Sequence, residues 1–82
     1  MKLPRDLSGR ELVRLLKCYG YEVVRQEGSH IRLRSSLKGH PHHITLPDHS
    51  ELKIGTLRAV VRLVAGYLEV EPAVVTRELF KP

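Results

Sequence analysis

Histidine is the residue type in this chain best suited to acid–base chemistry, because an ordinary pKa of about 6.5 lets it give or take a proton near neutrality. RNA cleavage needs a base to remove the 2′-hydroxyl proton and an acid to protonate the leaving oxygen, whereas DNA lacks that hydroxyl. The chain contains five histidines: His30, His40, His42, His43 and His49. His30 directly follows Gly28 and Ser29, in a turn whose backbone amides can meet a phosphate. A single histidine on a strand is more often structural, so these residues alone leave its role open.

Basic residues accompany His30 at a spacing that suits RNA phosphates. Alternation along the strand expected at 30–34 places His30, Arg32 and Arg34 on one side and two apolar residues on the other. The arginines then lie about 7 and 14 Å along the strand from His30, where they can hold flanking phosphates and offset charge in the transition state. Arg25 reaches the same face in one register of the preceding strand, and the sequence leaves that register open.

A second group of phosphate contacts is expected where a helix begins near residue 54. Lys53, Gly55 and Thr56 lie at this point, and the free amides and dipole of a helix N-terminus favour anions. Arg58 and Arg62 lie one turn apart, away from the apolar stripe of the same helix. Their position suits RNA contact and an ordinary solvated surface equally.

The other histidines and the single cysteine do not predict a metal site. The spacing of His40, His42 and His43 does not suit a closed tetrahedral site, and no carboxylate or thiol pattern accompanies them. Cys18 has no partner for an intrachain disulfide, and its place beside the apolar stripe of the first helix predicts a packing role. We therefore expect neither a metal nor another cofactor.

Length and charge narrow the range of partners. The 82 residues suffice for one domain without a deep cofactor cavity. A net charge of +5 favours polyanionic partners, such as nucleic acid, an anionic membrane or an acidic protein. Residues 1–5 lack the apolar run of a signal peptide, and no apolar stretch approaches the ~20 residues of a membrane span. We therefore expect a cytoplasmic protein without membrane contact.

Five main elements are predicted to position these side chains, followed by a short sixth. A capping box at Ser8 and Glu11 predicts a helix over 9–19. Strands are expected at 21–27, 30–34 and 43–46, with a polar hairpin loop at 35–42.

The C-terminal half is predicted to be helical. An apolar stripe from Ile54 to Leu68 predicts a long helix, which Gly66 is expected to end or kink, and Pro72 opens a short helix through about residue 79. Short connections favour an antiparallel meander, and two amphipathic helices must bury their stripes on one face of it. The sequence thus predicts an α+β fold with a three-stranded antiparallel sheet, two helices on one face, and His30 on the open face.

Two stretches together resemble the HicA family of mRNA interferase toxins. Residues 20–30 read GYEVVRQEGSH, similar to the family pattern G-[YF]-x-x-x-R-x-x-G-S-H, and residues 51–58 read ELKIGTLR, similar to E-[IL]-x-x-G-T-L-R. Residues 7–11 (LSGRE) and 43–47 (HITLP) also match. The resemblance covers about residues 3–66, so we expect a toxin domain over 1–66 and a C-terminal helical extension of the same domain over 67–82.

The resemblance implies a fold like that of a double-stranded-RNA-binding domain, in the order α-β-β-β-α. It also implies that His30 is the single catalytic residue of a metal-independent endoribonuclease that cleaves mRNA, with Gly28 and Ser29 as the family's preceding pair. A HicB-like antitoxin, which the charge of this chain predicts to be acidic, would neutralise it. The histidine-rich hairpin and the extension over 67–82 depart from the family pattern. A non-catalytic RNA-binding module using the same basic face, and an interaction protein with an acidic partner, are the alternatives.

Overall fold

Helix α1 (Gly9–Leu16) begins at the capping box that the sequence predicts. The Glu11 amide donates to Ser8 Oγ at 3.0 Å, and the Ser8 amide donates to Glu11 Oε1 at 2.9 Å. These bonds satisfy amides that the first turn of a helix otherwise leaves unpaired. The helix continues as the 3-10 helix η1 (Lys17–Tyr19), which ends at Gly20 with a φ of 80°. The predicted helix over 9–19 is therefore confirmed, with a tightened last turn.

The computed structural model describes residues 3–81, and its sheet is the predicted meander. Strands β1 (Glu22–Glu27), β2 (His30–Ser35) and β3 (His42–Pro47) are antiparallel neighbours in chain order. Burial alternates along β2, where Ile31 and Leu33 are buried and the residues between them are exposed. This alternation confirms that the sheet has one covered face and one open face.

Strand β1 lies at an edge that the helices leave uncovered. All of its residues are exposed, including Val23 at 49% and Val24 at 48%. The register shifts between Val23 and Arg25, so Val24 forms a β-bulge. This bulge sets which side chains of β1 share a face with those of β2.

Helix α2 (Ile54–Leu68) passes through Gly66 without a break, so the expectation that Gly66 ends it is wrong. The helix continues past Gly66 because the next residue, Tyr67, is buried in the core. The helix ends instead at Glu69, which adopts a left-handed φ of 60° and donates its amide to the carbonyls of Ala65 and Gly66. Helix α3 (Pro72–Phe80) follows, with the predicted proline in its first turn.

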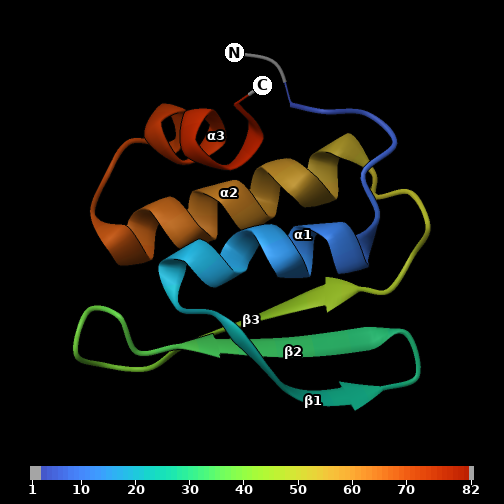
Figure 1. Ribbon diagram of the computed structural model, residues 1–82, viewed down its shortest axis with the longest axis horizontal. Helices are drawn as coiled ribbons and strands as arrows, with labels where there is room; N and C mark the ends of the chain where they lie inside the picture. The colour runs from blue at the N-terminus through green and yellow to red at the C-terminus, as the bar shows by residue number, and fades with distance from the viewer. Residues whose placement is uncertain (1–2, 82) are drawn as a thin grey trace.

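The elements stack in three layers (Figure 1). Helices α1 and α2 lie side by side on one face of the sheet, and α3 packs on the outer side of α2. The core between the layers includes Leu12, Leu16, Tyr21, Ile31, Leu33, Ile44, Leu46, Leu57, Val60 and Val64. The arrangement confirms the predicted α+β fold and is compatible with a double-stranded-RNA-binding domain. None of the helices within residues 3–81 has both the length and the apolar character needed to cross a membrane.

Candidate active site

His30 is the first residue of β2, and its side chain belongs to the open face. It is exposed, and it pairs with Glu27 of β1 on one side and Pro47 of β3 on the other. Its neighbour Ile31 points into the core. Because successive side chains of a strand point to opposite faces, His30 points away from the helices.

The turn before His30 presents backbone amides without partners. Gly28 has a φ of 55° and Ser29 does not have a positive φ, a sign pattern typical of a type II′ hairpin turn. Among the turn and loop hydrogen bonds of residues 3–81, neither of these two amides is a donor. The turn therefore keeps amide donors for an anion beside His30.

A network anchored on Asp48 holds this turn in place. The Asp48 amide donates to the Ser29 carbonyl at 2.6 Å. The Asp48 carboxylate accepts from Gln26 Nε2 at 3.1 Å and forms an ion pair with Arg10 at 2.9 Å. Gln26 also donates to the Gly28 carbonyl at 3.2 Å. These contacts join residues up to 38 positions apart, so no local pattern in the sequence signals them.

The start of α1 packs tightly against the same corner of the molecule. A Cβ atom added to Gly9 would collide with the carbonyl oxygen of Pro47, the residue that pairs with His30. The Gly9 amide also donates to the His49 carbonyl at 3.0 Å. Glycine is therefore required at this position for close approach of two backbone segments, a role that the capping box did not reveal.

Arginines form a row along the open face beside His30. The register places Arg25 directly opposite Arg32, which settles the question that the sequence left open. Arg34 lies further along β2, opposite Glu22. Arg25 forms an ion pair with Glu27 at 2.9 Å, but both side chains are largely exposed, so solvent screens this interaction. The open face thus carries three arginines within one or two strand positions of each other.

His43 shares the open face but lies far from His30. It pairs with Arg34, four residues along β2, so the two imidazoles are about 14 Å apart along the strand direction. A single proton transfer spans about 3 Å. The structure therefore does not bring these two histidines together as an acid–base pair.

The phosphate contacts expected at the start of α2 lie at the same end of the molecule as His30, but in a different layer. Lys53 precedes α2 in an extended conformation, Gly55 is exposed and Thr56 is half-buried. Figure 1 shows that the start of α2 and the β1–β2 turn lie at one end, with the start of α1 between them. These three residues belong to the helix layer and not to the open face of the sheet.

Two other histidines, His40 and His42, build a structural cluster with tyrosines that the sequence did not reveal. The His42 ring stacks on Tyr67 with centroids 4.7 Å apart, and its Nδ1 forms a hydrogen bond with the Tyr21 hydroxyl at 2.7 Å. Burial, followed by the neighbouring His43 and His40, lowers the pKa of His42. Burial, with a smaller effect of Tyr67, raises the pKa of Tyr21 to about 12. No three metal-ligating side chains come together within residues 3–81.

Cys18 does not have the packing role that its sequence position predicts. It lies in η1 beside the buried Tyr19, and its own side chain falls outside the apolar stripe and is exposed. Partial burial and the nearby Glu78 raise the pKa of its thiol. A raised pKa disfavours the thiolate, which is the nucleophilic form.

Comparison with known protein families assigns the chain to a family. A family model described as HicA toxin of bacterial toxin-antitoxin matches residues 9–65. This match spans more than half of the sequence and contains both the glycine–serine–histidine turn and the start of α2. The fold and the match define a toxin of a toxin–antitoxin system. The chain belongs to the HicA toxin family, and this membership implies an antitoxin partner. Searches of curated proteins and of solved structures returned no match.

Proposed function

We propose that this toxin is a metal-independent endoribonuclease that cleaves mRNA with His30 as its catalytic residue. The observation that carries the proposal is the position of His30 on the open face, between the free amides of Gly28 and Ser29 and the arginine row. The amides and guanidinium groups supply the positive environment that a phosphodiester needs. Lys53, Gly55 and Thr56 extend the RNA contact around the end of the molecule.

In the proposed reaction, an unprotonated nitrogen of His30 takes the proton from a ribose 2′-hydroxyl. The 2′-oxygen attacks the adjacent phosphorus, and the bond from phosphorus to the 5′-oxygen breaks as that oxygen gains a proton. The products are a 2′,3′-cyclic phosphate and a 5′-hydroxyl end. Arg32 and the turn amides stabilise the charge that builds on the phosphate oxygens. DNA has no 2′-hydroxyl and is not cleaved.

The decisive experiment compares wild-type protein with His30→Gln and His30→Ala on labelled single-stranded RNA in the presence of EDTA. Loss of a positioned acid–base group lowers the cleavage rate by about 10²- to 10⁴-fold. Because His30 is exposed, its removal shifts the free energy of unfolding by less than about 0.5 kcal/mol. His43→Gln and His49→Gln are matched controls, since each removes another exposed imidazole.

Near-wild-type cleavage by both His30 variants would exclude this residue as the catalyst. If the wild-type protein binds RNA in the same assay but never cuts it, the chain is a non-catalytic RNA-binding module.

The antitoxin is proposed to be a small, acidic, HicB-like protein that covers His30. A positive toxin attracts an acidic inhibitor quickly, and covering the open face blocks RNA. Co-purification from the native host at moderate salt, followed by a cleavage assay of the complex, tests this. Recovery of the chain with no acidic companion, or a complex that still cleaves RNA, would contradict it.

A further inference from the structure

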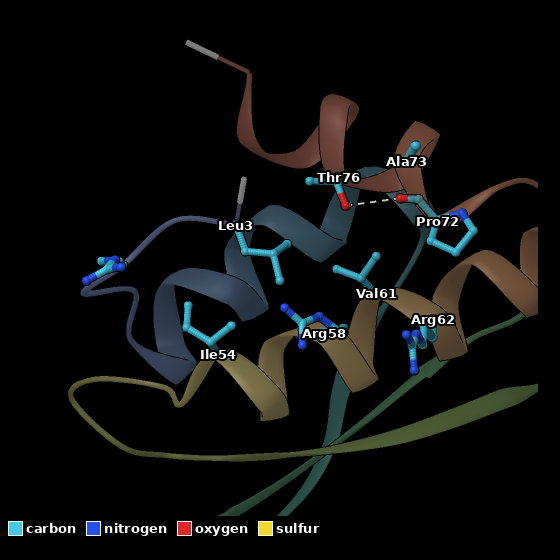
Figure 2. A pocket seen from close by; sticks show the side chains of 9 residues that line it. Leu3, Ile54, Arg58, Val61, Arg62, Pro72, Ala73 and Thr76 are labelled. Atoms are coloured by element: carbon cyan, nitrogen blue, oxygen red, sulfur yellow. Dashed lines mark hydrogen bonds between the residues drawn. The ribbon is translucent and has the colours of Figure 1, made fainter. Parts of the chain in front are cut away.

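A groove of about 510 Å³ opens on the side of the molecule that lies away from the sheet. Figure 2 shows its walls, which come from the N-terminal segment, the outer side of α2 and the start of α3. Leu3, Ile54 and Val61 contribute apolar side chains to the lining, and Arg5, Arg58 and Arg62 contribute basic ones. The groove therefore combines an apolar surface with three positive charges.

The groove depends on parts of the chain outside the family match. Residues 9–65 supply only its α2 wall, whereas Leu3 and Arg5 precede the match and Pro72 and Ala73 follow it. Helix α3 is fixed in place because Val75 and Leu79 are buried in the core. A wall anchored in this way gives the groove a defined shape.

The lining residues point to a ligand that is both acidic and apolar. Among residues 3–81, no carboxylate lines the groove, and none of its three arginines takes part in an ion pair or a side-chain hydrogen bond. The Thr76 hydroxyl donates to the Pro72 carbonyl at 3.0 Å, so its proton is not free to bind a ligand. The described part of the chain lines the groove with no aromatic side chain, so it lacks the usual platform for stacking bases of RNA. These features favour a peptide over a nucleic acid.

We propose that this groove binds an acidic segment of the antitoxin, with carboxylates on the arginines and leucine-like side chains on the apolar surface. The inference rests on the acidic antitoxin of the proposed function and adds a second contact to it. The molecule measures 30 Å along each of its two longer axes. A partner that occupies the groove reaches the open face with a linker of about ten extended residues. One antitoxin can then hold the toxin by the groove and cover His30 separately.

Binding is tested by fluorescence anisotropy with a labelled twelve-residue peptide, Glu-Leu-Glu-Glu-Leu-Leu repeated twice. The full chain carrying His30→Gln is used, so that binding is measured apart from RNA cleavage. The double variant R58E/R62E should weaken peptide binding at least tenfold, because it reverses two of the three charges. Ala73→Trp should weaken it similarly, because the new side chain fills the groove without changing its charge.

Two controls separate groove binding from general attraction to a basic protein. Arg77→Glu makes the same kind of charge change on an exposed position of α3 outside the groove and should leave the affinity within twofold. A peptide with glutamine in place of every glutamate should bind at least tenfold more weakly. Melting curves confirm that each variant is folded.

The proposal is overturned if R58E/R62E binds the peptide like the parent chain, or if Arg77→Glu weakens binding as much. It is also overturned if the groove variants lose RNA affinity and keep peptide affinity, since the groove is then an RNA surface. Failure of the wild-type protein to cleave RNA would refute the nuclease proposal. The groove proposal would then still be decided by the peptide-binding result alone.

Discussion

Replacing Tyr67 with phenylalanine removes the hydroxyl that fastens the β2–β3 hairpin loop to the end of α2. That hydroxyl accepts from the Lys38 amide at 2.9 Å and donates to the His40 carbonyl at 2.7 Å. The ring itself is only 7% exposed and stacks on His42, and phenylalanine preserves this packing. The substitution therefore removes these two hydrogen bonds to loop backbone, together with a long one of 3.5 Å that the hydroxyl donates to the Ser35 carbonyl at the end of β2.

The expected cost follows from these two bonds. A hydrogen bond contributes about 0.5–1.5 kcal/mol net to stability. Lys38 and His40 are exposed, so water replaces part of what their backbone groups lose, and we expect a total of about 1–2 kcal/mol. A domain of this size shifts its Tm by about 4–8 °C for each kcal/mol, which gives a decrease of about 4–16 °C.

Thermal melts and amide hydrogen exchange at Lys38 measure the effect. Tyr21→Phe is the matched control, because it removes a hydroxyl from the same cluster, bonded to His42 at 2.7 Å, without touching the loop backbone. Lys38 exchange should accelerate in Tyr67→Phe and stay unchanged in Tyr21→Phe. RNA cleavage should persist in both, since the loop lies at the opposite end of the sheet from His30 (Figure 1). A Tm change below about 1 °C together with unchanged Lys38 exchange would refute the anchoring role.

Three further outcomes are expected. Gly9→Ala should lower the free energy of unfolding in urea titrations by about 1–3 kcal/mol, because the new Cβ collides with the Pro47 carbonyl, and an unchanged value would show that this corner relaxes freely. The pKa of His42 is lower in the folded state, so the unfolded state binds more protons as pH falls through about 6.5. The free energy of unfolding should therefore be full above that pH and decrease below it. The decrease should be smaller in His42→Gln, which removes the titrating group. RNA binding by His30→Gln should weaken with salt at a log–log slope of about −2 if Arg32, Arg34 and Lys53 each contact a phosphate, and a flat response would exclude these contacts.

The features predicted correctly from the sequence depend on neighbouring residues. The capping box at Ser8 and Glu11 begins α1 because both partners lie within one turn. The alternation around Ile31 assigns His30 to the open face because the strand period is two residues. Such patterns are complete within a few positions, so the fold and the face of the candidate site could be read before any tertiary contact was known.

The features that the sequence missed depend on contacts between distant segments. The face of Arg25 follows from the bulge at Val24, which only the pairing with β2 reveals. Asp48 holds the turn before His30 through backbone and side-chain contacts to three separate segments. Gly66 illustrates the opposite error, since a local helix-ending signal was overridden by burial of Tyr67 in the next position. Local propensity is a weak prior wherever tertiary packing competes with it.

The position of α3 explains how this chain carries an extension without obstructing its open face. Tyr19 donates a hydrogen bond of 2.5 Å to Glu78, which ties α3 to the end of the first helix. Burial and this contact with Glu78 raise the pKa of Tyr19, so its hydroxyl remains protonated as the donor. Because α3 adds its apolar residues to the far side of α2, the sheet surface with His30 stays exposed (Figure 1). The extension enlarges the core of a small domain and, by the same contacts, creates a basic groove on the side of the molecule away from the open face of the sheet.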